Sequence, residues 1–119
     1  MDSIEVLVVD DDADIRSTLE EILVEEGYRV ASAANGREAL ERLRVVRPRL
    51  ILLDLSMPVM SGFEFREAQR ADAELAKIPT VVMTAYDRML EKTSGMQLAD
   101  CLAKPVRLDE LLKVVARFC

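Results

Sequence analysis

Residues 50–58, LILLDLSMP, join an apolar run of strand length to a carboxylate and a proline. Residues 50–53 have the length and aliphatic composition of a strand that is buried on both faces. Asp54 follows this run directly, and Pro58 favours a turn soon afterwards. The sequence therefore places one carboxylate at the carboxyl end of a buried parallel strand, where ligands of open α/β sheets bind.

Polar or charged residues also follow three other apolar runs. The acidic triplet Asp10, Asp11 and Asp12 follows residues 6–9, Thr84 and Ala85 follow residues 80–83, and Lys104 and Pro105 follow Leu102 and Ala103. The carboxyl ends of parallel strands meet at one edge of a sheet, so residues that are distant in sequence converge there. We therefore expect these residues to lie beside Asp54.

Apolar runs of strand length alternate along the chain with stretches of helical periodicity. Five such βα units fit, which predicts an α/β fold with a doubly wound, five-stranded parallel sheet covered by helices on both faces. No linker divides the chain, so residues 1–119 are expected to form one domain. The strands are expected at residues 6–9, 28–33, 50–53, 80–83 and near 102–103.

The helices are predicted from their boundary residues and apolar stripes. Gly27 is expected to end the first helix, Asn35 to begin the second and Gly62 to open the third. Residues 87–99 contain a glycine and lack a clean stripe, so we expect a short or mobile helix there. The predicted inward stripes are Ile15, Leu19, Ile22 and Leu23 in the first helix, Ala39, Leu40 and Leu43 in the second, and Leu108, Leu111, Leu112 and Val115 in the last.

The composition disfavours several classes of function. Sixteen Lys and Arg against 22 Asp and Glu give a net charge of −6, which disfavours nonspecific binding to nucleic acid or to an anionic membrane. No run approaches the ~18 apolar residues of a membrane span, and the N-terminus lacks the pattern of a secretory signal, so we expect a cytoplasmic protein. Cys101 and Cys119 are expected to remain thiols there. The absence of histidine disfavours a zinc enzyme or a histidine-dependent triad.

The residue types at the predicted edge suit a phosphoryl group bound beside a metal ion. Two or three carboxylates with a backbone carbonyl are typical ligands of a hard cation, which favours Mg²⁺ over zinc, with Mn²⁺ as a substitute. Asp54 is the candidate nucleophile, and Lys104 together with the metal would offset the charge of the phosphoryl group. Thr84 would donate a hydrogen bond to a phosphoryl oxygen.

Each of these residues also has a purely structural explanation. Asp54 fits a solvated strand end, and Asp12 fits the N-cap of the first helix with Asp14 near its positive end. Thr84 fits a β-branched strand residue, and Lys104 fits a solvated charge before a turn. The combination favours a shared phosphoryl site, because residues suited to binding a phosphoryl group or its metal follow four of the five predicted strands.

With these residues placed, the chain resembles the receiver domain of two-component response regulators over essentially its whole length. The motifs that carry the resemblance are highly specific. They are residues 8–12 (VVDDD), which match the acidic pocket of the family, residues 54–62 (DLSMPVMSG), which match its Asp-x-x-Met-Pro-x-Met-x-Gly segment, Thr84 with Ala85, and Lys104 with Pro105, typically a cis proline.

The resemblance implies a role for each acidic residue of the predicted site. Asp54 would be the phosphoacceptor. Asp11, Asp54 and the backbone carbonyl of Ser56 would bind Mg²⁺, and Asp10 would act largely through metal-bound water.

The resemblance also implies that Thr84 and Lys104 contact the phosphoryl oxygens, and that the strands have the order 2-1-3-4-5 of a flavodoxin-like three-layer sandwich. The chain departs from the family pattern at Cys101, where receivers usually have the Tyr or Phe that turns inward on activation. The stretch between Thr84 and Lys104 is also about two residues shorter than usual.

We therefore expect a bacterial signalling switch rather than an enzyme. It would take a phosphoryl group from a phosphohistidine on a sensor histidine kinase or histidine phosphotransfer protein and slowly hydrolyse the aspartyl phosphate. Its output would pass to a downstream protein or a separate domain, without direct binding to nucleic acid or membrane. One alternative is a receiver-like interaction module that works without phosphorylation. Another is a Mg²⁺-dependent phosphohydrolase with an aspartyl nucleophile, although such enzymes generally have a second Asp where this chain has Ser56.

Overall fold

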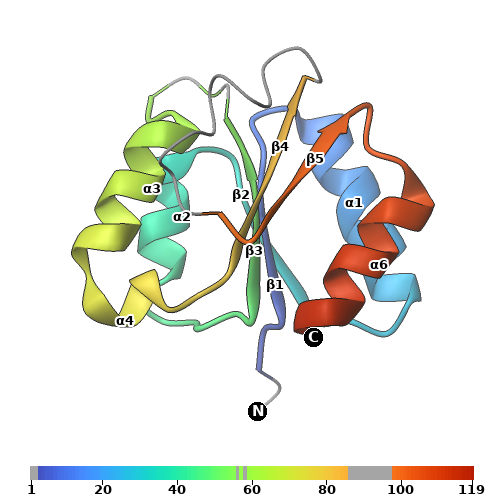
Figure 1. The fold of residues 1–119 in the computed structure, drawn as a ribbon, viewed down its shortest axis with the longest axis horizontal. Helices are drawn as coiled ribbons and strands as arrows, with labels where there is room; N and C mark the ends of the chain where they lie inside the picture. Colours follow the sequence, from blue (N-terminus) through green and yellow to red (C-terminus); the bar gives the residue numbers. More distant parts are fainter. Residues whose placement is uncertain (1–2, 56, 58, 86–97) are drawn as a thin grey trace.

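The computed structural model describes residues 3–55, 57, 59–85 and 98–119. Within these residues, five parallel strands form one sheet in the predicted order β2-β1-β3-β4-β5. Helices cover both faces of the sheet, which gives the predicted three layers (Figure 1). The strands are β1 Val6–Val9, β2 Val30–Ala33, β3 Leu50–Asp54, β4 Thr80–Ala85 and β5 Asp100–Lys104, and the helices are α1 Ala13–Glu25, α2 Gly36–Arg42, α3 Gly62–Ala71, α4 Ala73–Ala76 and α6 Leu108–Phe118.

Alternate residues of the strands contribute to two separate cores. In β1, Leu7 and Val9 pack in the cluster that includes α2, α3 and α4, whereas Val6 and Val8 pack in the cluster that includes α1 and α6. These two groups of helices lie on opposite sides of the sheet (Figure 1). Burial on both faces explains why β1 and β3 read as continuous apolar runs and not as alternating ones.

Side-chain caps and a glycine set several helix boundaries where they were predicted. The Asp12 carboxylate accepts hydrogen bonds from the backbone N–H groups of Asp14 and Ile15, at 2.9 and 3.1 Å, and so begins α1. Gly27 follows the end of α1 with a φ of 94°, a left-handed conformation that favours glycine. Asn35 caps α2 as expected.

The first strand has its predicted bounds, whereas the other four differ from theirs, because pairing with a neighbour decides how far a strand extends. The ladder between β1 and β2 starts at Val30 and not at residue 28. Thr84 and Lys104 were predicted to follow their strands, but both lie within the ladder between β4 and β5. The single-turn helix α4, which Asp72 caps, was not predicted.

The apolar stripes of α1 and α6 are only partly buried. Leu19, Leu23 and Leu111 belong to the core, as predicted. Ile15 and Leu108 were also predicted to face inward, but they are 37% and 53% exposed. The predicted helix at residues 87–99 lies almost entirely outside the described residues. In the part of the chain that the structure describes, no helix is long and apolar enough to cross a membrane.

Candidate functional site

The carboxyl ends of the central strands bring the predicted acidic residues together. Val9 of β1 pairs with Leu53 of β3, so the residues that follow them, Asp10 and Asp54, emerge at the same level of the sheet. One carboxylate oxygen from each of Asp10, Asp11 and Asp54 lies within 4.8 Å of the others. Asp10 and Asp54 are buried, whereas Asp11 is exposed. The cluster, called the acidic pocket below, is therefore partly buried and open to solvent at Asp11.

Lys104, the last residue of β5, reaches into the same pocket. Its Nζ atom lies 3.1 Å from Oδ1 of Asp54 and 3.5 Å from Oδ2 of Asp10. Burial disfavours the charged form of this amine, but the carboxylates of Asp54 and Asp10 outweigh that effect and raise the pKa of Lys104 above its ordinary value. The ammonium therefore stays protonated and offsets part of the acidic charge.

The donor set of the acidic cluster fits a divalent cation. Among the described residues, the side-chain charges of the cluster are three carboxylates and the ammonium of Lys104, which leaves an excess of negative charge. Two of the carboxylates are buried, where unbalanced charge is costly. Oxygen donors alone are the preferred ligands of a hard cation such as Mg²⁺. The predicted fourth donor, the carbonyl of Ser56, lies outside the described residues.

Thr84 and Cys101, which the sequence analysis singled out, lie on β4 and β5. Thr84 is buried on β4, one residue beyond Met83, which pairs with Asp54. Its own partner in the ladder is Ala103, so it lies at the same end of the sheet as the acidic cluster. Cys101 lies on β5 and is partly buried against the core that includes α3.

Two glycines make close backbone contacts with residues that follow β3. The N–H of Gly62 donates to the carbonyl of Leu55 at 3.0 Å, and a Cβ added at Gly62 would lie 2.6 Å from the carbonyl oxygen of Asp54. The N–H of Gly36 donates to the carbonyl of Met60 at 3.3 Å. A side chain at Gly62 or at Gly36 would obstruct these close approaches.

Arg16 is a residue of this region that the sequence analysis missed. Its Nη1 atom donates to the backbone carbonyl of Asp10 at 2.7 Å. One feature of the sequence indicates that Arg16 makes a specific contact. It lies in the first turn of the predicted first helix, where the positive end of the helix dipole disfavours a cation without a specific partner.

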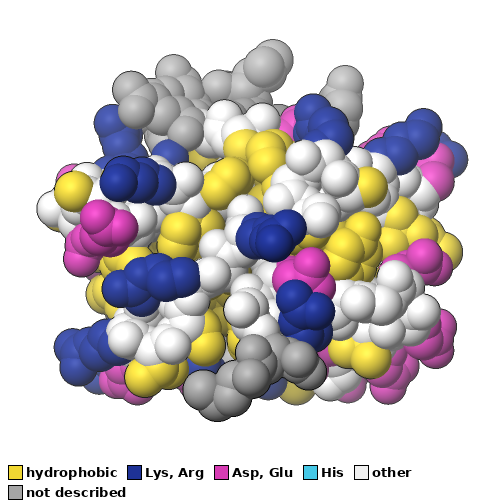
Figure 2. Space-filling model, turned by 90° about the horizontal axis from the view of Figure 1, so that it is seen from below, with side chains coloured by type: hydrophobic (Ala, Val, Ile, Leu, Met, Phe, Trp, Pro, Cys, Tyr) yellow, Lys and Arg dark blue, Asp and Glu magenta, His cyan; other side chains and the backbone are white. Residues whose placement is uncertain are grey.

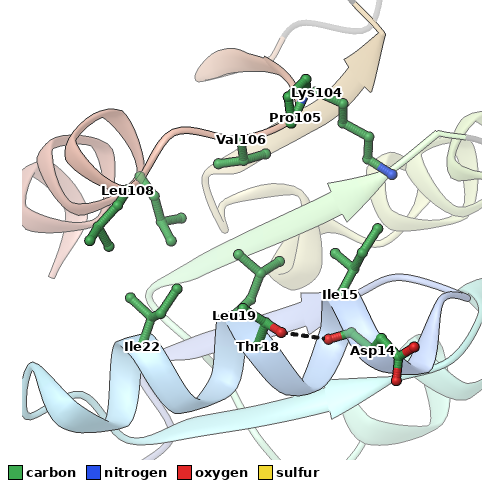
Figure 3. A pocket seen from close by; sticks show the side chains of 10 residues that line it. Asp14, Ile15, Thr18, Leu19, Ile22, Lys104, Pro105, Val106 and Leu108 are labelled. Carbon is green, nitrogen blue, oxygen red and sulfur yellow. Dashed lines mark hydrogen bonds between the residues drawn. The ribbon is translucent and has the colours of Figure 1, made fainter.

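An apolar groove adjoins the acidic pocket. It has a volume of about 630 Å³ and runs between α1 and the segment that leads from β5 into α6. Figure 3 shows Ile15, Leu19 and Ile22 on its α1 side, Val106 and Leu108 opposite them, and Lys104 at one end. The exposed ends of the two apolar stripes thus form one surface, which shares Lys104 with the acidic pocket.

Among the residues that the structure describes, the opposite end of the molecule has no comparable concentration of acids. Figure 2 views the face where the strands begin, and the described Asp and Glu side chains on it are interspersed with basic and hydrophobic ones. The acidic cluster at the carboxyl ends of the strands is therefore a local feature and not a consequence of the net charge alone.

Comparisons with known proteins agree with this architecture. A family model described as "Response regulator receiver domain" matches residues 6–116. Sporulation initiation phosphotransferase F of Bacillus subtilis is 35% identical over 115 residues, which cover 95% of this chain and 91% of that protein. The chain spans about half the length of other curated relatives that it matches, which are named as response or transcriptional regulators.

Solved structures agree in fold over nearly the whole chain. Chemotaxis response regulator CheY4 of Vibrio cholerae has a TM-score of 0.88 and 35% identity, with 99% of this chain and 100% of that chain covered. The receiver domain of sensor histidine kinase PA1611 from Pseudomonas aeruginosa, solved with a magnesium ion coordinated in its active site cleft, has a TM-score of 0.86 and 28% identity, with 98% of both chains covered. Since the family match and these likenesses extend over nearly all of the chain, the protein belongs to the response regulator receiver domain family.

Proposed function

We propose that this chain accepts a phosphoryl group on Asp54 from a phosphohistidine of a partner protein and changes conformation in response. Membership of the family makes it a signalling switch of two-component systems, with histidine kinases as its class of partner. The observation that carries the assignment to Asp54 is the position of its carboxylate, 3.1 Å from the Lys104 ammonium and within the cluster of three acids.

In the proposed reaction, an oxygen of Asp54 forms a bond to phosphorus while the P–N bond of the phosphohistidine breaks and the imidazole leaves. Lys104 and Thr84 would hold the phosphoryl oxygens. Asp10 and Asp54 are buried, so their carboxylates would need little rearrangement as the charge of the phosphoryl group develops beside them. Slow hydrolysis of the aspartyl phosphate would then reset the switch.

Asp11, Asp54 and the backbone carbonyl of Ser56 would hold Mg²⁺, Asp10 would act through a bound water, and Mn²⁺ would substitute. The metal would supply charge stabilisation to the phosphoryl oxygens. Support for this set comes from the clustered oxygens of the three acids and from the excess of carboxylates over ammonium groups among the described residues of the cluster.

Metal affinity is expected to depend on Asp11 and not on Lys104. Replacing Asp11 by Ala should weaken Mg²⁺ binding by more than about 10-fold, since it removes a proposed ligand. Replacing Lys104 by Ala removes a cation 3.1 Å from Asp54 and should leave Mg²⁺ binding unchanged or tighter. Calorimetric titration with MgCl₂ measures both. Equal losses in the two variants would contradict the assignment of the metal to the acids.

We also propose that the apolar groove receives the helix that carries the phosphohistidine. The groove shares Lys104 with the acidic pocket, so a helix that lies in it would present a side chain to Asp54. Its apolar lining suits the apolar face of an amphipathic helix.

An aspartate substituted into this groove is expected to slow phosphoryl transfer from a protein donor but not labelling by acetyl phosphate. Histidine kinases and phosphotransfer proteins are first screened for transfer to the wild-type chain. With the best donor, Ile15→Asp and Leu108→Asp should each reduce the rate about 5-fold or more, as expected when an interface contact of about 1 kcal/mol is lost. Labelling by acetyl phosphate should not change.

Val45→Asp is the matched control for the groove, because Val45 is also an exposed aliphatic residue, at 83% exposure, but does not line it. It should retain the wild-type rates of transfer from the protein donor and of labelling by acetyl phosphate. If the groove variants slow these two reactions equally, or slow neither, the groove is not the docking surface.

A single labelling experiment distinguishes the proposed switch from its alternatives. Incubation with acetyl phosphate and Mg²⁺, followed by intact-mass measurement, should add one phosphate to the chain. An interaction module that works without phosphorylation would remain unlabelled. A phosphohydrolase would consume acetyl phosphate over many turnovers without accumulating the label.

We propose that residues 1–119 form one receiver domain of a cytoplasmic, bacterial protein, and that its output passes to a downstream protein or a separate domain without direct binding to nucleic acid or membrane. The net charge of −6 supports the last point. Because Cys101 replaces the usual aromatic residue, the proposed conformational change would not use an aromatic side chain at that position.

A further inference from the structure

Asp10 is tied to four different parts of the fold. Its N–H donates to the carbonyl of Ala33 in β2 at 3.1 Å, and its Oδ1 accepts from the N–H of Asp12 at 3.0 Å. Its Oδ2 accepts from Lys104 at 3.5 Å, and its carbonyl accepts from Arg16 at 2.7 Å. The bond from Arg16 is the shortest of these, and it is the one that comes from the side chain of a helix.

The bond from Arg16 lies beside Asp11 in the chain. The Asp10 carbonyl precedes Asp11, and the N–H of Asp12, which bonds back to Asp10, follows it. Asp11 itself is exposed, so packing contributes little to its position. Two hydrogen bonds, one on each side, therefore hold the backbone that presents the Asp11 carboxylate to the cluster.

The position of the Arg16 side chain is unfavourable in free energy unless a specific contact compensates for it. Its guanidinium stands in the first turn of α1, where the helix dipole disfavours a cation. The side chain is half-buried, and ordering a long side chain costs conformational entropy. A planar guanidinium with fixed donors is nevertheless well suited to holding a carbonyl in one direction.

We propose that Arg16 is a positioning residue for the metal site: through the Asp10 carbonyl it holds Asp10 and Asp11 at the spacing from Asp54 that a divalent cation needs. This inference rests on the proposed function. Arg16 would not be a ligand and would not contact the phosphoryl group. Its charge alone acts in the opposite direction, because a nearby guanidinium repels a metal cation.

Positioning and repulsion therefore predict opposite changes in metal affinity. If positioning dominates, Arg16→Ala should bind Mg²⁺ about 10-fold more weakly than the wild type, the loss typical of a residue that orients a ligand. Arg16→Lys retains a cation that can donate to a carbonyl, so it should recover part of this affinity. If repulsion dominates, Arg16→Ala should bind Mg²⁺ more tightly.

The test is calorimetric titration of the wild type and the variants with MgCl₂, together with urea unfolding in the absence of metal. Arg44→Ala is the matched control, since it removes an exposed arginine in the turn that follows α2, away from the acidic cluster. It should bind Mg²⁺ as the wild type does. Should Arg16→Ala not fold, Arg16→Gln replaces it, as a neutral side chain that retains a donor but is shorter.

Each outcome has one meaning. Weaker Mg²⁺ binding by the neutral variant with partial recovery in Arg16→Lys supports the inference. Unchanged or tighter binding by a folded neutral variant overturns it, even if the unfolding midpoint falls, because a purely structural role moves the midpoint and leaves metal affinity unchanged. A wild-type chain that does not bind Mg²⁺ would instead overturn the proposed function.

Discussion

Replacement of Asp54 by Asn is expected to abolish labelling by acetyl phosphate. The amide has nearly the same shape as the carboxylate, but it lacks the nucleophilic oxygen that would form the bond to phosphorus. Intact-mass measurement after incubation with acetyl phosphate and Mg²⁺ should find one added phosphate on the wild type and none on Asp54→Asn.

Asp12→Asn is the control for this experiment. Asp12 belongs to the same acidic triplet as Asp10 and Asp11, but its carboxylate caps α1, and Asn is an equally good N-cap. The variant should therefore fold and accept the label. A phosphate that persists in Asp54→Asn, on Asp10 or Asp11, would show that the wrong acid has been assigned as the acceptor.

The acidic cluster could be predicted from the sequence because strand direction is enough to specify it. Once residues 6–9 and 50–53 are identified as parallel strands, Asp10 and Asp54 must leave the sheet at the same edge. Asp12 could be predicted as the N-cap for a similar reason, because capping depends only on local sequence.

Features that depend on contacts between distant elements could not be predicted in this way. Helical periodicity identifies an apolar face but not how much of that face another element covers, so Ile15 and Leu108 were expected in the core and instead border a groove. The contact of Arg16 with the Asp10 carbonyl is local in sequence, but it depends on a side-chain conformation that no pattern specifies. The close approach of Gly62 to Asp54 likewise appears only when β3 and α3 are placed.

Replacement of Gly62 by Ala should damage both stability and the site. The added Cβ would lie 2.6 Å from the carbonyl oxygen of Asp54 and 2.7 Å from Cα of Leu55. Both are backbone atoms and cannot rotate away, so β3 or the start of α3 must move. Overpacking of this kind typically costs about 1–3 kcal/mol, which exceeds the gain of about 1 kcal/mol from the better helix propensity of alanine. Because the shift falls on Asp54, labelling by acetyl phosphate should slow as well.

Gly27→Ala separates the two effects of this substitution. Gly27 has a φ of 94°, but a Cβ there would meet no atom within 4 Å, so its cost is backbone strain of roughly 1–2 kcal/mol far from the acidic cluster. Urea unfolding should therefore detect a loss of stability in both variants, whereas labelling should slow only in Gly62→Ala. If Gly62→Ala were as stable as the wild type and labelled at the same rate, the close packing of α3 against the backbone of the proposed phosphoacceptor would have no part in holding Asp54 in place.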